Sequence, residues 1–313
     1  MNNFKDNNVL SNYFRYDNPA EKKIVMKIYY YVHTGHRTGL DRFRRACTII
    51  RALGDVDITL LCSDFRIANE ARHFGVSKAV GIDLVRNIPK IAEHGDKIIF
   101  DSDEANPLML SDMRKYFSTF IRVSDDINDE KAEDEFLISP YLSGDGICNT
   151  VVFDDKYFIQ EEKTIKLSYF FGDDDYEKDL EKNIEFIEEL NPLLQLGFYY
   201  FFDYEDMLKE RFKSHHEFEE YDKTIKKSQI LITASPQAVF ESLASGCKPI
   251  YIQREDYKTN FLELFKKLNI PVVKNDEYCQ LLTTLKTLEN HEYYKVEHNS
   301  KKLTKFIKES LNL

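Results

Sequence analysis

The chain has 313 residues, with 43 Lys and Arg against 54 Asp and Glu, a net charge of −11 and 42% apolar residues. This length favours two domains. The acidic charge argues against a protein that coats duplex DNA or an anionic membrane, because such binding depends on clustered Lys and Arg. No apolar run approaches the ~18 residues of a membrane-spanning helix. We therefore expect a cytoplasmic protein with no nucleic-acid partner and no membrane span.

From residue 23 onward, short β-rich runs alternate with amphipathic stretches of helical length. Strands are predicted at residues 24–32, 56–62, 78–82, 97–101 and 119–123. Helices are predicted between them, at residues 40–53, 65–74, 85–94 and 107–117. Strands separated by helices of this length form right-handed βαβ units, which build a parallel sheet with helices on both faces. The first domain is therefore predicted to be an open α/β sheet.

The alternation is lost at residues 124–160, which we interpret as a loop-rich crossover, and then resumes. Further strands are predicted at residues 166–171, 194–201, 229–233, 248–252 and 271–273, and further helices at residues 177–190, 204–212, 236–245, 261–268 and 276–288. The predicted organisation is a polar N-terminal extension at 1–22, α/β domains at 23–150 and 151–300, and a C-terminal helix at 301–313. Open α/β sheets bind ligands at the carboxyl ends of their strands, so we expect a site in the cleft between the domains.

The first candidate site follows the first strand directly, in the segment HTGHRTGLDRFRR that begins at His33. Its glycines, Gly39 among them, allow a sharp turn and close approach of a ligand. Residues 37–51 hold five Arg and one Asp inside an acidic protein. Guanidinium groups match phosphate and carboxylate bidentately. We expect Arg37 or Arg42 to bind an anionic ligand; the alternative is that they pair with surface carboxylates.

The same loop holds two histidines, His33 and His36, with Asp41 close by. Imidazole titrates near pH ~6.5, which suits proton transfer at neutral pH. At least one of the two is a candidate for catalysis, and simple exposure in a loop is the alternative. No third ligand stands at a defined spacing, so no metal site is predicted.

The helix that starts in this loop has a clear apolar face. Its members recur at helical spacing and are Leu40, Phe43, Cys47 and Ile50. The arginines outside this pattern are expected to point outward, and they are Arg44, Arg45 and Arg51.

The second candidate site lies in the segment ITASPQAVFESLASGCKPIYI, where a strand ends and a helix begins. Ser235 is predicted to be the N-cap and Pro236 the first helical residue. Free backbone N–H groups in the first turn, at Gln237 and Ala238, would then form an anion site at the cleft. Glu241 follows on the same helix and could accept hydrogen bonds from a ribose diol. A solvent-facing helical Glu is the alternative.

Together these two segments resemble the GT-B glycosyltransferases. The segment TGLDRFRRACTIIRALGDVDITLLC is similar to the start of their N-terminal domain, and ITASPQAVFESLASGCKPIYI to their donor site. The resemblance covers the edges of both domains. It implies two Rossmann-like α/β domains with an interdomain cleft and a metal-independent enzyme without a cofactor. The implied substrate is a nucleotide diphosphate sugar, UDP-linked, used in surface glycan or polysaccharide biosynthesis.

Within this superfamily the chain most resembles the UDP-sugar hydrolase of the pseudaminic acid pathway and the MurG-like spore-coat polysaccharide family. Ser124-Asp125-Asp126 is similar to the DD element of that family, and the segment FGDDD around Gly172 to its G-G-x-D loop. The chain also departs from the pattern. The catalytic His of the hydrolases would fall on Leu40, and Phe171 replaces the first glycine of the G-G-x-D loop.

The resemblance implies that the second domain holds the nucleotide. Backbone N–H groups at residues 235–238 would bind the diphosphate, Glu241 the ribose, and the Gly172 loop the base or phosphate.

The first domain would present a sugar or glycan acceptor. His36 or Asp41 would act as general base, and Arg37 or Arg42 would stabilise charge. Transfer is favoured because the hydrolase histidine is not in place. Two alternatives stay open: a hydrolase that uses water as acceptor, and a non-catalytic sugar-nucleotide-binding accessory protein.

Overall fold

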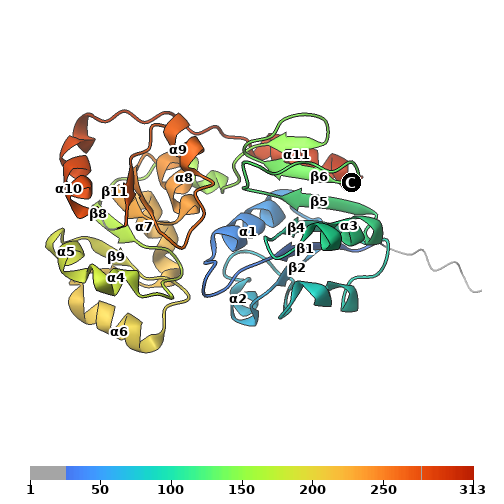
Figure 1. Cartoon of the computed structure of the whole chain (residues 1–313), viewed down its shortest axis with the longest axis horizontal. Helices are drawn as coiled ribbons and strands as arrows, with labels where there is room; N and C mark the ends of the chain where they lie inside the picture. Colours follow the sequence, from blue (N-terminus) through green and yellow to red (C-terminus); the bar gives the residue numbers. More distant parts are fainter. Residues whose placement is uncertain (1–25, 276) are drawn as a thin grey trace, which may run out of the picture.

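The computed structural model describes residues 26–275 and 277–313. The expected extension at residues 1–22 and the start of the first predicted strand lie outside this part of the chain. Two sheets, each covered by helices on both faces, lie side by side along the longest axis of the molecule (Figure 1). This confirms the prediction of two α/β domains.

The first sheet has seven strands in the order β3-β2-β1-β4-β5-β6-β7, and all its neighbouring strands run parallel. Its central strands are continuous apolar runs because both of their faces are buried. β1 and β4 end together, with Val32 opposite Asp101, so the residues that follow them meet at one edge. The strands are β1 (Ile28–Val32), β2 (Ile58–Cys62), β3 (Ala79–Gly81), β4 (Lys97–Asp101), β5 (Thr119–Val123), β6 (Phe136–Ser139) and β7 (Ile147–Asn149).

The helices of the first domain occur where the sequence predicted them, with one change of type. The expected face of the first helix is buried, at Leu40, Phe43, Cys47 and Ile50. In place of the α-helix predicted at residues 85–94, the chain forms a 3₁₀ helix at residues 85–90. Its Pro89 explains the change, because proline removes a backbone donor. The helices are α1 (Asp41–Leu53), α2 (Phe65–Glu70), η1 (Val85–Lys90) and α3 (Pro107–Tyr116).

Residues 124–160 are more regular than the expected loop-rich crossover. β6 pairs with β5 and β7 pairs with β6, so both strands extend the first sheet. The prediction is wrong at these two strands. They are four and three residues long, too short for a period of two to be recognised. The short helix η2 (Asp155–Phe158) then leads into the second domain.

The second sheet has six parallel strands in the order β10-β9-β8-β11-β12-β13. Its strands are β8 (Ile165–Phe170), β9 (Leu193–Gln195), β10 (His215–His216), β11 (Ser228–Thr233), β12 (Lys248–Gln253) and β13 (Val272–Lys274). The helices around it are α4 (Asp179–Lys182), α5 (Ile184–Glu189), α6 (Phe202–Arg211), η3 (Phe218–Glu220), α7 (Tyr221–Lys227), α8 (Pro236–Ala244), α9 (Leu262–Lys267), α10 (Tyr278–Thr287) and η4 (Leu288–Asn290).

Three details of the second domain differ from the sequence prediction. The helix expected at 177–190 is interrupted at Asn183 and forms α4 and α5. The strand expected at 194–201 ends at Gln195, and the chain then turns through a loop. β10 and α7 were not predicted, since β10 is two residues long and α7 has a polar composition.

The C-terminal helix α11 (Ser300–Ser310) returns to the first domain, where it lies beside β6 in Figure 1. Leu303, Ile307 and Leu311 are buried in the same apolar core as α1 and β1. The Lys97 ammonium group also donates a hydrogen bond to the carbonyl of Leu311. The chain therefore crosses between the two domains twice.

Candidate functional site

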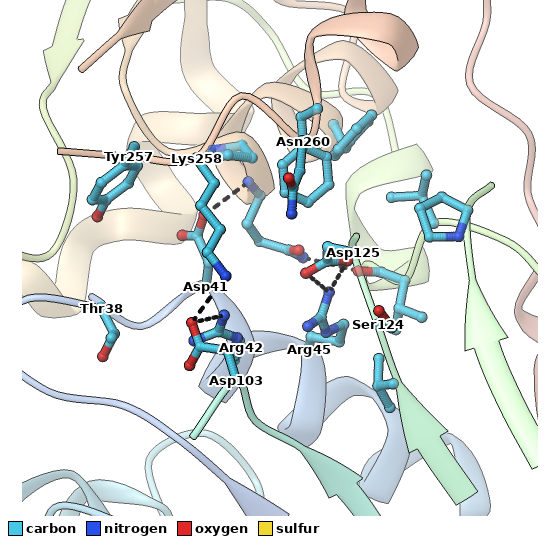
Figure 2. A pocket seen from close by; sticks show the side chains of 18 of the residues that line it. Thr38, Asp41, Arg42, Arg45, Asp103, Ser124, Asp125, Tyr257, Lys258 and Asn260 are labelled. Atoms are coloured by element: carbon cyan, nitrogen blue, oxygen red, sulfur yellow. Dashed lines mark hydrogen bonds and ion pairs between the residues drawn. The ribbon is translucent and has the colours of Figure 1, made fainter. Parts of the chain in front are cut away.

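A pocket of about 200 Å³ lies between the two domains. From the first domain it is lined by the start of α1 and the loops after β4 and β5, with Arg42, Asp103 and Asp125 (Figure 2). The second domain contributes the start of α8 and the loop after β12, including Lys258. These segments follow the carboxyl ends of strands in both sheets, so the cleft lies where open α/β sheets bind ligands.

The start of α8 has the local structure that its sequence predicts. β11 ends at Thr233, and the Ser235 hydroxyl accepts a hydrogen bond from the Ala238 N–H at 3.0 Å. Pro236 occupies the first turn, where its missing N–H costs no intrahelical hydrogen bond. The N-terminus of α8 therefore points at the cleft with the partial positive charge of a helix start.

A carboxylate from the other domain already occupies this anion position. Asp41, the first residue of α1, accepts a hydrogen bond from the Ser235 hydroxyl at 2.6 Å and another from the Gln237 N–H at 3.1 Å. Burial raises the pKa of Asp41, and the two hydrogen bonds oppose that rise. The structure thus places two of the predicted site segments in direct contact, with Asp41 as an internal ligand of α8.

Glu241 is 1% exposed and not solvent-facing, which rules out the alternative interpretation of this residue. Its carboxylate accepts hydrogen bonds from the Tyr221 hydroxyl at 2.7 Å and from the Gln237 side-chain amide at 2.8 Å. Burial raises the pKa of Glu241 to about 7, although the Arg44 guanidinium and both hydrogen bonds oppose this. The Glu241 carboxylate is therefore positioned to accept hydrogen bonds from hydroxyl groups, and it accepts one from Tyr221 in this structure.

The prediction that Arg44, Arg45 and Arg51 point outward is wrong. Arg44 is buried and bonds both oxygens of Asp173 at 2.8 and 2.9 Å. Arg45 is buried between Asp101 and Asp125, with its shortest contact to each at 2.7 Å.

Arg51 is half-buried and pairs with Asp154. Helical spacing identifies the apolar face only. It carries no information about acidic groups on distant segments that can bury an arginine as an ion pair.

The two arginines predicted to bind an anion lie in different surroundings. Arg42 lines the pocket and pairs with Asp103 at 3.0 Å, as Figure 2 shows. Arg37 also lines the pocket, but its side chain is 67% exposed, pairs with Glu177 at 3.3 Å and lies 4.0 Å over the Tyr176 ring. Arg42 is therefore the better placed of the two to meet a ligand inside the pocket.

The two candidate histidines, His33 and His36, also lie in different surroundings. His36 stacks on Phe201 and bonds the Tyr199 carbonyl through Nδ1 at 3.2 Å, in a shallow groove apart from the main pocket. Burial and the nearby Arg66 lower the pKa of His36.

His33 instead bonds Asp103, which lines the pocket, through Nδ1 at 2.8 Å. This bond leaves Nε2 as the ring nitrogen that can take up a proton. The hydrogen bond from His33 and the charge of Arg42 hold the pKa of Asp103 well below its usual range.

The glycine-containing loops meet at the domain boundary. Gly39 has a φ of +63°, and a Cβ there would lie 2.9 Å from the Asp174 carboxylate. Gly172 also has a positive φ, of +138°. Asp174 is fully buried, and its carboxylate accepts hydrogen bonds from Arg254 and Tyr257. Burial raises the pKa of Asp174 to about 6.

Sequence reasoning missed several residues that line or support the pocket. Asp103 lies two residues after the end of a correctly predicted strand, β4, so its place at a carboxyl edge was a usable signal. Lys258 reaches to 3.8 Å from Asp103 out of a loop of the second domain, and nothing in its sequence context indicated this. Tyr221, which donates to Glu241, begins a helix that was not predicted.

Neither a metal cluster nor a membrane-spanning helix occurs in the described part of the chain. Within residues 26–275 and 277–313, no three His, Cys, Asp or Glu side chains are grouped so as to hold a metal ion. None of the helices that the structure describes combines the length and apolar content that crossing a membrane needs.

No protein-family model and no curated protein matches the sequence. Solved structures do match the fold. UDP-GlcNAc 2-epimerase of Methanocaldococcus jannaschii, in complex with UDP-GlcNAc and UDP, has a TM-score of 0.61 at 12% identity, over 92% of this chain and 100% of that one. MnaA of S. aureus with UDP has a TM-score of 0.59 at 12% identity, over 92% and 98%.

The chain has the GT-B fold. MurG of Acinetobacter baumannii overlaps less well, with a TM-score of 0.48 at 9% identity, over 91% of this chain and 100% of that one. At such identities the likeness shows the fold and not the activity. The resemblance to the pseudaminic acid pathway hydrolase stays a prediction.

Proposed function

We propose that this GT-B protein binds a nucleotide diphosphate sugar, UDP-linked, between its domains and transfers the sugar to an acceptor. One observation carries the proposal: the start of α8 is an anion position that already binds a carboxylate. Glu241 lies on the same helix and accepts a hydroxyl hydrogen bond. A nucleoside diphosphate carries the same two kinds of group, an anion in its diphosphate and hydroxyl donors in its ribose. The matching structures from M. jannaschii and S. aureus are both described as complexes with UDP, which supports this choice of nucleotide.

The donor roles follow the sequence prediction except at Ala238, whose N–H already donates to the Ser235 hydroxyl. The Gln237 N–H and the Ser235 hydroxyl would bind the diphosphate. Glu241 would accept the ribose hydroxyls in exchange for the Tyr221 hydroxyl. The Gly172 loop would lie near the base or phosphate. Fixed N–H donors and a helix start stabilise the charge of a leaving diphosphate.

For the general base we propose His33 with Asp103 in place of His36. The Nδ1 bond to Asp103 holds the imidazole ring, as a carboxylate does in other nucleophile-activating pairs. Nε2 of His33 would take the proton of the acceptor hydroxyl as its oxygen attacks the sugar. The bond from that sugar carbon to the diphosphate oxygen breaks, and the diphosphate leaves with the electron pair. Arg42 would stabilise negative charge in the pocket.

A second candidate is epimerisation of the UDP-linked sugar, because the M. jannaschii structure, which overlaps with a TM-score of 0.61, is described as a UDP-GlcNAc 2-epimerase. Water could also replace the acceptor, which would make the protein a hydrolase. The products distinguish the three reactions: a new glycoside, an epimeric UDP-sugar, or free sugar with UDP.

The test begins with a thermal-shift screen of UDP, GDP, CMP and their sugars, because a ligand that binds only the native protein raises its melting temperature. UDP release is then measured for wild type, His33→Ala and the control His94→Ala, which changes an exposed first-domain histidine. We expect His33→Ala to lose ~10²–10⁴-fold in turnover, the usual contribution of a general base. UDP affinity should stay within about twofold, and His94→Ala should match wild type.

Full turnover in His33→Ala would refute the assignment of the base. Binding of UDP without any release from a UDP-sugar would favour the non-catalytic accessory role. Failure of every nucleotide to shift the melting temperature would refute the proposed function.

A further inference from the structure

One face of α1 makes charged contacts with the second domain. Asp41 and Arg44 are three residues apart and therefore lie on the same side of the helix. Asp41 bonds Ser235 and Gln237 at the start of α8. Arg44 bonds Asp173, just after β8. The Asp41 carboxylate and the Arg44 guanidinium of the first domain thus both bind groups of the second domain.

Arg44 is also linked, through Tyr221, to Glu241, the carboxylate that we propose to bind the ribose. The Arg44 guanidinium lies 3.6 Å over the ring of Tyr221, whose hydroxyl bonds Glu241. Nε of Arg44 is buried and, within the described part of the chain, has no hydrogen-bond partner. Arg44 and Glu241 both line a pocket of about 380 Å³. A buried donor without a partner is costly, so the closed state leaves one hydrogen bond of Arg44 unmade.

The Asp41 carboxylate and a diphosphate cannot occupy the start of α8 together. Both need the Gln237 N–H and the Ser235 hydroxyl, which donate one hydrogen bond each. Both are negative, and like charges a few ångströms apart repel strongly in a partly buried site.

We propose that α1 is a built-in competitor of the donor, and that a nucleoside diphosphate must displace Asp41 from the start of α8, which opens the domains. This inference rests on the proposed function, because the diphosphate site is the one assigned there. Arg44 and Asp173 form the second contact of the same closed state. Only open molecules can bind the donor, so its apparent affinity equals the affinity of the open state multiplied by the fraction of molecules that are open.

The binding test compares UDP affinity, by titration calorimetry, in wild type, Asp41→Asn and Asp41→Ala. Asp57→Asn is the control, because Asp57 is an exposed first-domain carboxylate paired with Lys78 on the surface. We expect Asp41→Ala to bind UDP at least about tenfold more tightly than wild type, with Asp41→Asn between the two. Asp57→Asn should bind as wild type does.

A second measurement reports the conformation without any nucleotide. Spin labels are placed on one exposed site in each domain, through Lys90→Cys in η1 and Glu210→Cys in α6. The exposed Cys279 is changed to Ser, and the other four cysteines are buried. We expect a single short distance in wild type and a longer or broader distribution in Asp41→Ala. Adding UDP to wild type should shift its distribution in the same direction.

The outcomes separate the competitor from the proposed function. UDP binding to wild type with no tighter binding by Asp41→Ala would overturn the competitor and leave the function standing. An unchanged distance distribution in Asp41→Ala would also overturn it. If no variant binds any nucleotide, the proposed function fails, and the competitor fails with it even if Asp41→Ala opens.

Discussion

Two acidic side chains are buried with raised pKa values, Glu241 at about 7 and Asp174 at about 6. In both cases burial is the main cause, since it penalises the charged form. Between the ordinary pKa and the raised one, the folded protein holds a proton that the unfolded chain has lost. These groups therefore stabilise the fold fully at low pH, and that stability is lost as the pH rises through 6 to 7.

Glu241→Gln tests this pH dependence. Glutamine resembles the neutral carboxyl, so the variant should lose less stability than wild type between about pH 5 and pH 7.5. Melting temperatures measured across this range give the comparison, with the exposed Glu181→Gln as control. Parallel curves for wild type and Glu241→Gln would show that Glu241 is ionised throughout and contradict the raised pKa.

At the scale of elements, the loop between β1 and α1 brings the two domains together. Gly39 takes a left-handed conformation, with a φ of +63°, that side chains disfavour. A Cβ at this position would also lie 2.9 Å from Asp174 and 3.4 Å from the Tyr257 hydroxyl. Gly39 therefore has two roles: it allows the backbone to turn before α1, and it leaves space for Asp174 and Tyr257 of the second domain.

Gly39→Ala should lower the free energy of unfolding by more than Gly95→Ala does. Gly95 also has a positive φ, of +92°, but nothing within 4 Å of the added Cβ, so it measures the backbone strain alone. Strain of this kind is worth roughly 1–3 kcal/mol. Urea unfolding followed by circular dichroism gives both values. Equal losses would mean that Asp174 and Tyr257 move aside without cost.

At the scale of the whole molecule, the last helix ties the end of the chain to the first domain. α11 follows the second domain in sequence but buries Leu303, Ile307 and Leu311 against α1 and β1. The first domain therefore completes its core only after the second has been synthesised.

Ile307→Ala should lower the free energy of unfolding by roughly 2–5 kcal/mol, the cost of a cavity in a packed core. Lys305→Ala changes an exposed residue of the same helix and should stay within about 0.5 kcal/mol of wild type. Urea unfolding checks both. A small effect of Ile307→Ala would mean that α11 is dispensable for the first domain.

Local sequence determined the order and type of most elements. The strands of both sheets are apolar runs, and the start of α8 follows from Ser235 and Pro236, whose effects act within one turn. These signals need no knowledge of distant residues. Two α/β domains were predictable on this basis, and the GT-B fold from the resemblance of two segments to GT-B glycosyltransferases. The short strands β6, β7 and β10 carry too few residues for a recognisable pattern.

Only the tertiary structure decided which charged groups meet. Asp41 and Ser235 are 194 positions apart, and Arg44 and Asp173 are 129 apart. Charge alone does not select such partners, because the chain offers 43 cationic and 54 acidic side chains. The relative orientation of the two sheets selects the partners across the domain boundary. The packing within the first domain decides that His33, and not His36, bonds a residue that lines the pocket. The sequence alone showed an acidic protein with one basic segment. Only the tertiary structure showed that the arginines of this segment pair with acidic side chains of both domains.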